Sequence, residues 1–348
     1  MRLKRILNLF SIATLSLFLV ACSSKEVPTQ ESKEVQKTEV AEATNEEYPI
    51  VIKHAYGETV IEEQPERIVT IGWANQDTPL ALGVVPTGYS MANFGPVDRY
   101  GMHPWTAERV AELGEENPNV FQDTAGIDFE AISDSTPDII LAAYSGLTQE
   151  EYDLLSEIAP VVAYPNLPWA TYWRDQIVIN ATAMGMKEEG EAYVKDMEAL
   201  IAEKVSQYPQ LSEVTGAFVW VDATDLSSFY LYTPVDTRAA YLTDLGIEFP
   251  EELSKQVPTD AFYLTVSAEN IDLLKDLDIL VAYGDESLLE AMQADPLFAT
   301  VPAVQKGAVA LIDSNSNIAG AATPSALSIP AVIDEYTALL AEAADKVK

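Results

Sequence analysis

Short apolar runs that alternate with helical patterns constrain the fold of this 348-residue chain more than any other feature. Runs of three to five small or branched apolar residues predict strands that are buried on both faces, as in parallel sheets covered by helices. Both halves of the chain contain such runs: Ile68–Ile71, Ile139–Ala142, Val161–Ala163, Ala217–Val221, Ile279–Ala282 and Ala308–Ile312. Because helical patterns separate them, the chain predicts βαβ units and an α/β fold with mainly parallel sheets.

Roughly 300 residues carry this pattern, more than one hydrophobic core usually serves, so we expect two lobes. Residues 187–208, between the halves, place apolar side chains at helical spacing and are bounded by Gly185 and Pro209. A helix of that length would measure about 33 Å, enough to cross between lobes. A surface helix within one lobe has the same periodicity. The predicted domains are an N-terminal lobe (48–186), a connecting helix (187–208) and a C-terminal lobe (209–348).

A weak internal repeat supports two related lobes. In each half a Leu-Gly pair is followed by a glutamate, then an aspartate that opens an apolar run, then a tyrosine that closes it. The spacing from glutamate to tyrosine is the same in both copies, although the other spacings differ. The matched residues are Glu130, Asp138 and Tyr144 in the first half and Glu269, Asp278 and Tyr283 in the second.

The N-terminus has the pattern of an export signal. Arg2, Lys4 and Arg5 precede an apolar run, Ile6–Val20, whose helix would rise only about 22 Å, too short to span a hydrocarbon core of about 30 Å. The run ends in Leu-Val-Ala-Cys, which resembles the lipobox of bacterial lipoproteins. The alternative is an ordinary cleaved signal, but Cys22 is the only cysteine of the chain and has no disulfide partner within it.

We therefore expect a lipoprotein signal peptide (1–21) and a lipidated Cys22. A disordered tether (22–47), rich in Ser, Thr, Glu, Lys and Gln, would follow. Such a protein would be lipid-anchored in the cell membrane on its extracytoplasmic face.

Charge and missing motifs exclude several functions. The chain has 55 acidic against 20 basic residues and a formal net charge of −35, which opposes binding to nucleic acid. Phosphate-binding glycine loops, zinc-protease helices and nucleophile elbows are missing from the sequence. The two histidines, His54 and His103, lie far apart in sequence, so no metal site is expected. The sequence predicts a protein that is not an enzyme and has no resident cofactor.

Four segments resemble a known family: Pro65–Asp77, Leu82–Gly88, Gly126–Ile140 and Pro168–Asp175. They are similar to the iron–siderophore-binding lipoproteins of ABC importers, relatives of the vitamin B12- and haem-type binding proteins. The resemblance implies a class III periplasmic-binding-protein fold, in which a single long helix joins two Rossmann-like lobes and the ligand lies between them. It also implies a monomer that captures a small-molecule iron complex, a ferric siderophore, and passes it to an ABC transporter permease.

Ligands of parallel α/β sheets bind beyond the carboxyl ends of the strands, which points to side chains in the loops there. Aromatic faces would contact the organic shell of a siderophore, and an arginine would balance its negative charge. Because the siderophore surrounds its own iron, the protein need not ligate the metal. The candidate ligand-binding residues are Trp73, Asn75, Gln76, Tyr144, Ser145, Trp169, Trp173, Arg174, Tyr230, Tyr232, Arg238, Tyr283 and Asn315. Core packing is the alternative for each aromatic residue.

The resemblance assigns a second role to one glutamate per lobe, which docks on arginines of the permease. Glu130 and Glu269 occupy the matching positions and are the glutamates of the internal repeat. The alternative is that both are ordinary solvated acids.

Two other functions stay open at this point. Within binding proteins, haem or a corrinoid could replace the siderophore, since haem iron accepts tyrosine among its ligands. A surface adhesin or an extracytoplasmic enzyme on the same scaffold is an alternative of another class. The sequence leaves open whether the siderophore is a catecholate, a hydroxamate or a carboxylate.

Overall fold

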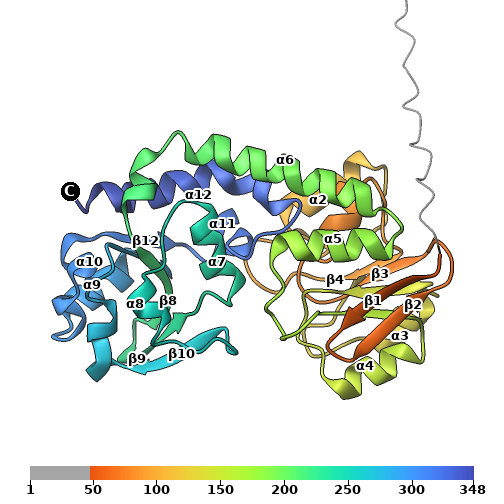
Figure 1. Ribbon diagram of the computed structural model, residues 1–348, viewed down its shortest axis with the longest axis horizontal. Coiled ribbons are helices and arrows are strands. Elements are labelled where there is room, and N and C mark those ends of the chain that lie inside the picture. Colours follow the sequence, from red (N-terminus) through yellow and green to blue (C-terminus); the bar gives the residue numbers. More distant parts are fainter. Residues whose placement is uncertain (1–47) are drawn as a thin grey trace, which may run out of the picture. The chain divides into compact units, whose positions relative to one another are not determined.

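The computed structural model describes residues 48–348, which form two five-stranded sheets with helices around them and one additional hairpin (Figure 1). The predicted signal peptide, Cys22 and the tether lie outside the described residues. Within residues 48–348, no helix combines the length and the apolarity that crossing a membrane requires. Each predicted apolar run coincides with a strand, which confirms the α/β fold class.

The N-terminal sheet is entirely parallel, in the order β5-β4-β3-β6-β7. Its strands are β3 (Ile68–Thr70), β4 (Gly88–Ser90), β5 (Val120–Phe121), β6 (Ile139–Ala142) and β7 (Val161–Ala163). Alternate residues of β6 point to opposite faces. Ile139 and Leu141 pack under the hairpin β1 (Ile50–His54)–β2 (Gly57–Ile61) and the end of α5 (Trp173–Ala183). Ile140 and Ala142 pack against α3 (Phe129–Asp134) and α4 (Gln149–Ser156).

Two further helices complete this lobe, α1 (Asp77–Ala81) after β3 and α2 (Pro104–Glu112) after β4. They meet over a small core of Leu80, Tyr89, Met102 and Val110. Helix α1 begins at Asp77.

The C-terminal sheet has the order β10-β9-β8-β11-β12 and is mixed. Its strands are β8 (Gly216–Asp222), β9 (Asp225–Tyr232), β10 (Tyr263–Ser267), β11 (Ile279–Tyr283) and β12 (Val309–Ile312). Strands β8, β11 and β12 are parallel. Only Ala223 and Thr224 separate β8 from β9, and so short a connection can join only antiparallel strands. Strand β10 extends the hairpin.

Short helices surround this second sheet, and their bounds are η1 (Pro209–Glu213), α7 (Thr237–Asp244), α8 (Glu251–Ser254), η2 (Ala268–Leu274), α9 (Glu286–Ala294), η3 (Phe298–Thr300), α10 (Pro302–Lys306) and α11 (Asn317–Ala321).

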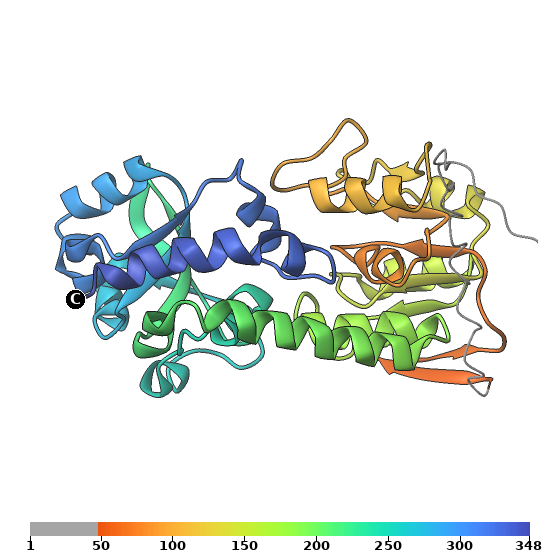
Figure 2. The ribbon, with the colours of Figure 1, turned by 90° about the horizontal axis from the view of Figure 1, so that it is seen from above.

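Two long helices run beside each other, α6 (Lys187–Val205) and α12 (Ser328–Asp345) (Figure 2). Helix α6 follows α5 of the first lobe and leads into η1 of the second, so it joins the lobes along the chain. The chain leaves the helix after Val205, three residues before the end that periodicity predicts, and Pro209 opens η1. Tyr193 donates to the Ala326 carbonyl (2.8 Å) and Lys204 pairs with Asp334 (2.7 Å), which holds α6 against the α12 region.

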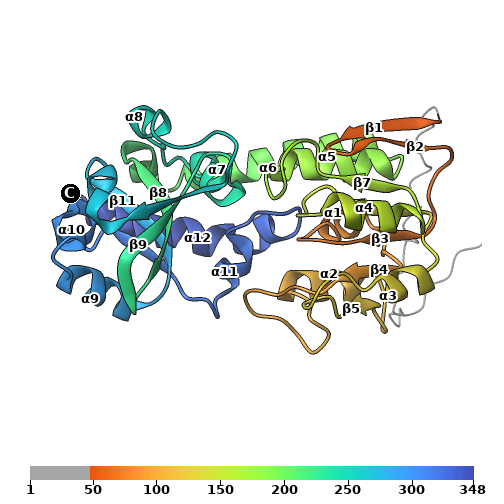
Figure 3. The ribbon, with the colours of Figure 1, turned by 90° about the horizontal axis from the view of Figure 1, so that it is seen from below.

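The turn between α11 and α12 reaches the N-terminal lobe (Figure 3) and meets a buried carboxylate there. Asp77, at the start of α1, accepts hydrogen bonds from Ser325 Oγ (2.5 Å) and from Thr106 Oγ1 of α2 (3.0 Å). Burial raises the pKa of Asp77 from 3.8 to about 6, although both hydroxyls act in the opposite direction. One carboxylate therefore links two helices of the first lobe to the second.

This raised pKa gives a stability prediction. The folded state holds the Asp77 proton more tightly than the unfolded state, so the stabilisation is complete below about pH 4 and is lost as the pH rises through about 6. In Asp77→Asn, which is uncharged at every pH, this loss should disappear. The difference in free energy of unfolding between Asp77→Asn and the wild type should therefore shift in favour of the variant by about 2–3 kcal/mol when the pH is raised from 4 to 7. Urea unfolding at several pH values measures the difference. Asp134→Asn, an exposed carboxylate of α3, is the control, and parallel curves for wild type and Asp77→Asn would contradict the prediction.

Candidate functional site

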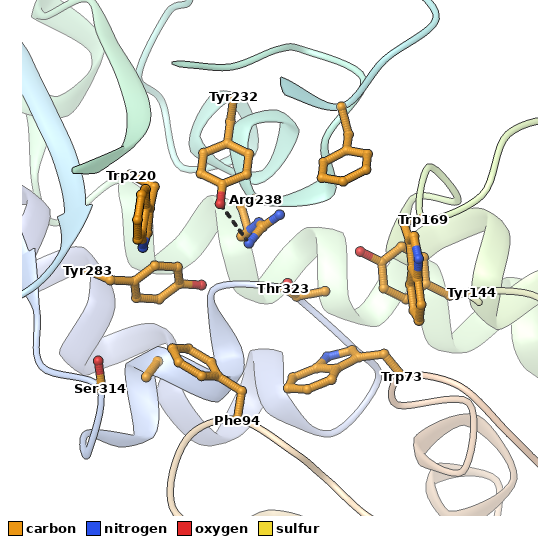
Figure 4. A pocket seen from close by; sticks show the side chains of 12 residues that line it. Trp73, Phe94, Tyr144, Trp169, Trp220, Tyr232, Arg238, Tyr283, Ser314 and Thr323 are labelled. Atoms are coloured by element: carbon orange, nitrogen blue, oxygen red, sulfur yellow. Dashed lines mark hydrogen bonds between the residues drawn. The ribbon is translucent and has the colours of Figure 1, made fainter. Parts of the chain in front are cut away.

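A cavity of about 450 Å³ lies between the two lobes and is lined mainly by aromatic side chains (Figure 4). One wall comes from the N-terminal lobe: Trp73, Phe94, Tyr144 and Trp169. The other comes from the C-terminal lobe: Trp220, Tyr232, Arg238, Phe262, Tyr283, Ser314, Ala319 and Thr323. A cavity of this size and lining is typical of a small-molecule site.

The loops after β3 and β6 carry Trp73 and Tyr144 to the same edge of the sheet, because these strands are parallel neighbours. The fully buried Asn75 holds the loops together. Its Nδ2 donates to the carbonyls of Ile71 (2.7 Å) and Tyr144 (2.9 Å), while its Oδ1 accepts from the Tyr144 amide (3.2 Å). Gln176 and Asn180 of α5 also donate to this Oδ1 (3.2 and 3.0 Å). Asn75 thus positions the wall without lining the cavity.

Two glycines make this wall possible. Gly72 has φ +83°, and a Cβ there would lie 2.6 Å from the Tyr144 carbonyl oxygen, so only glycine fits between the two loops. A Cβ on Gly146 would lie 2.2 Å from Nε1 of Trp169. The indole therefore rests on the Gly146 backbone and meets the Tyr144 ring edge-on, at 5.4 Å between centroids.

The opposite wall is built on the face of the mixed sheet. Trp220 of β8 stacks on its cross-strand partner Tyr230 of β9, with ring centroids 5.0 Å apart. Tyr283, at the end of β11, packs against the buried Phe218 ring (5.1 Å). Across the cavity Phe94 meets Tyr283 edge-on at 5.0 Å, so the two lobes touch through aromatic rings at one side of the site.

Arg238 is the only charged residue among the described residues that line the cavity. Its guanidinium lies over the Tyr232 ring, 4.1 Å from the centroid, with Nη1 3.4 Å from the Tyr232 hydroxyl (Figure 4). The other edge of the guanidinium forms a bidentate salt bridge with Asp236: Nε donates to Oδ1 (2.9 Å) and Nη2 donates to Oδ2 (2.7 Å). Burial lowers the pKa of Arg238, but the bonds to Asp236 outweigh this and raise the pKa above its ordinary value. The salt bridge with Asp236 therefore balances the positive charge of Arg238.

Six of the residues singled out from the sequence line this cavity: Trp73, Tyr144, Trp169, Tyr232, Arg238 and Tyr283. The remaining ones lie elsewhere. Asn75 and Gln76 are buried behind the wall, and Tyr230 lies behind Trp220. Ser145 borders a neighbouring pocket of the first lobe, and Asn315 borders one of the second lobe beside Asp313.

Trp173 and Arg174 join helices and do not line the cavity. Trp173 Nε1 donates to Asp244 Oδ2 of α7 (2.9 Å), and Arg174 Nη1 pairs with the same oxygen (2.8 Å). Arg174 Nε also pairs with Glu198 of α6 (2.6 Å). These contacts connect α5, α6 and α7, which belong to both lobes and to the helix between them.

Six lining residues are absent from the sequence-based set: Phe94, Trp220, Phe262, Ser314, Ala319 and Thr323. Trp220 lies inside a predicted strand, where it is the exposed position between buried neighbours. A tryptophan at an exposed position of an otherwise buried strand indicates a binding surface. That exposure can be recognised only once the pairing of β8 and β9 is known. Phe94 lies in an irregular segment between β4 and α2, which no periodicity marks.

The predicted docking glutamates are exposed and occupy equivalent places. Glu130 lies in the first turn of α3, before β6, and Glu269 in the first turn of η2, before β11. The following aspartates also match: Asp138 accepts from the Arg67 amide beside β3 (2.8 Å), and Asp278 from the Thr215 amide beside β8 (2.9 Å). The internal repeat therefore corresponds to one structural unit in each lobe.

Residues 68–316 match the family described as Periplasmic binding protein. The chain belongs to this family. Its members bind solutes and are not enzymes, in agreement with the sequence-based prediction. Among residues 48–348, no group of three or more His, Cys, Asp or Glu side chains is placed to hold a metal ion.

Similar proteins share most of the chain. A crystal structure of PiaA from Streptococcus pneumoniae TIGR4 in complex with ferrichrome is 45% identical, has a TM-score of 0.81 and covers 86% of this chain and 100% of that chain. The Fe(3+) dicitrate-binding protein FecB of Escherichia coli K12 is 27% identical over 77% of this chain and 86% of its own length. YhfQ of Bacillus subtilis 168, assigned as an ABC transporter substrate-binding lipoprotein, is 26% identical over 58% of this chain and 55% of its own. The match to PiaA confirms the predicted class III fold.

Proposed function

We propose that this chain is a membrane-anchored receptor that captures an electroneutral ferric siderophore and delivers it to the permease of an ABC importer. The complex would belong to the trihydroxamate class, of which ferrichrome is a member. The charge of the cavity carries this proposal: an aromatic cavity whose single cation, Arg238, already has a buried anionic partner in Asp236.

The chemistry of iron complexes explains why neutrality matters. Three hydroxamates carry one negative charge each and balance Fe³⁺, whereas three catecholates carry two each and leave the complex with three negative charges. Burying an uncompensated charge among aromatic rings is costly, so a cavity of no net charge favours the neutral complex. The siderophore supplies the iron ligands, and the protein supplies ring faces and a few donors.

Hydrogen-bond donors for such a complex are directed into the cavity. Nη1 of Arg238 is not engaged by Asp236 and is directed towards the Tyr232 hydroxyl. In Figure 4 the hydroxyl of Tyr283 is directed into the same space. These groups would donate to hydroxamate oxygens, and the rings of Trp73, Trp169 and Trp220 would pack on the organic shell. The similarity to PiaA, whose crystal structure contains ferrichrome, supports the same ligand class.

We predict that ferrichrome quenches the intrinsic tryptophan fluorescence in a saturable manner, because three tryptophans line the cavity. Trp220→Ala should weaken the affinity about tenfold or more, as expected for loss of a large aromatic contact. Leu154→Ala removes an exposed apolar side chain of α4 that does not line the cavity and is the control. Haem and cobalamin are titrated in parallel. Saturable binding of either one in place of ferrichrome, or of none of the three, would overturn the proposal.

The membrane anchor is part of the same proposal. Its support is the lipobox-like sequence that ends at Cys22 and the similarity to YhfQ. Two acyl chains on Cys22 would hold the receptor at the membrane, close to its permease.

We predict that Cys22→Ser abolishes membrane attachment. The wild-type protein, expressed in a bacterial host that processes lipoproteins, should sediment with membranes and be extracted only by detergent. The variant should be released in soluble form. Its ferrichrome affinity should be unchanged, because the residues that line the cavity are far from Cys22 in the sequence. Equal membrane attachment of both proteins would contradict the assignment of Cys22.

Permease docking through Glu130 and Glu269 completes the proposal. Both side chains are exposed, one on each lobe, at equivalent positions of the repeated unit. Neither lines the cavity, so docking and ligand capture would use different surfaces.

We predict that Glu130→Arg or Glu269→Arg abolishes cellular uptake of iron-labelled ferrichrome, since charge reversal would repel the permease arginines. The purified variants should keep the wild-type affinity. Glu150→Arg, a reversal at an exposed glutamate of α4, should leave uptake intact. A weakened affinity in either purified variant, or an equal loss of uptake in Glu150→Arg, would argue against docking.

A further inference from the structure

Asp236 lies directly behind Arg238, the one cation among the described residues that line the cavity. It is the residue before α7, and its Oδ1 also accepts from the Arg238 amide (2.9 Å), so it caps the helix that carries Arg238. The side chain of Asp236 is 1% exposed and that of Arg238 is 19% exposed. The carboxylate is therefore shielded from a bound ligand, which would meet the guanidinium first.

Uncharged side chains pack against the pair. Tyr232 and Tyr283 face the guanidinium, and Thr237 of the same helix shares a hydrogen bond with Tyr144 (3.0 Å). Asp244, at the end of α7, is paired with Arg174 of α5, which also pairs with Glu198 of α6. The electrostatic potential that a ligand meets in this cavity depends mainly on how completely Asp236 cancels Arg238.

We infer that Asp236 is the positioning residue that sets the charge selectivity of the receptor: it cancels the Arg238 cation and thereby disfavours anionic ferric complexes. This inference rests on the proposed function. It assigns a specificity role to a residue that does not line the cavity.

The physical reason is the surroundings of the pair. Next to buried aromatic rings a charge is screened less than in bulk water and interacts more strongly with its neighbours. With Asp236 ionised, an anionic ligand gains attraction from Arg238 and loses most of it to repulsion from Asp236. With Asp236 neutral, the full attraction remains. A neutral complex experiences little of either effect, so its affinity depends on ring contacts and on the Nη1 donor.

The experiment compares two probes, ferrichrome and the ferric triscatecholate of enterobactin, which carries three negative charges. Asp236→Asn retains an acceptor for the helix cap and for the guanidinium while removing the charge. We expect its affinity for the triscatecholate to rise tenfold or more and its affinity for ferrichrome to change less than about threefold. The gain should shrink as salt is added, which a merely structural effect would not do.

Two further variants test the opposite change in charge and provide the control. Arg238→Gln leaves Asp236 unbalanced, so it should discriminate against the triscatecholate more strongly than the wild type does. The double variant, Asp236→Asn with Arg238→Gln, makes the pair uncharged and should return the ratio of the two affinities close to the wild-type value. If Asp236→Asn does not fold, as judged by circular dichroism, these two variants decide the question.

The outcomes separate the inference from the function on which it rests. An affinity ratio that is the same in every variant, or a ratio insensitive to salt, overturns the inference while ferrichrome binding by the wild type upholds the function. A wild-type protein that binds neither probe overturns the proposed function, and the inference with it.

Discussion

Polar contacts between the lobes, one buried and others partly buried, lie behind the cavity and determine how the two aromatic walls face each other. Asp77 of the first lobe is bonded to Ser325 before α12, and Asp244 of the second lobe accepts from Trp173 and Arg174 of α5. Breaking the contact between Asp77 and Ser325, which are both fully buried, would leave polar groups short of a partner, which costs more than the bond itself contributes. The cavity is therefore largely formed before a ligand arrives, in contrast to binding proteins whose domains close about a hinge.

The two walls are built by a repeated unit. In each lobe an aspartate holds the neighbouring strand, a buried strand follows, and a tyrosine at the strand end turns towards the cavity: Tyr144 after β6 and Tyr283 at the end of β11. The same unit carries an exposed glutamate near its start. The duplication thus relates the ligand site and the proposed docking residues, because both are attached to the same strand position of each sheet, β6 in the first and β11 in the second.

Charge acts at two ranges in this protein. The chain as a whole is strongly acidic, with a net charge of −35, while the cavity has one cation balanced by one buried anion. The acidic surface weakly repels anionic complexes, and salt screens this effect beyond about 8–10 Å. Discrimination at close range depends on Arg238 and Asp236. Both effects favour a neutral ligand, so the overall composition and the site are consistent with each other.

The sequence by itself determined the family and the buried strands β3, β6, β7, β8, β11 and β12, because apolar runs and short motifs are local properties of the chain. Only the tertiary structure decided which polar and aromatic residues reach the cavity. Trp169 lines it and Trp173 does not, since a helix α5 that packs against α7 directs Trp173 to Asp244. Arg238 lines it and Arg174 does not, although both have aromatic residues nearby in the sequence. Periodicity specifies that a helix or strand has a buried face, but which partner covers that face depends on contacts between segments far apart in the chain.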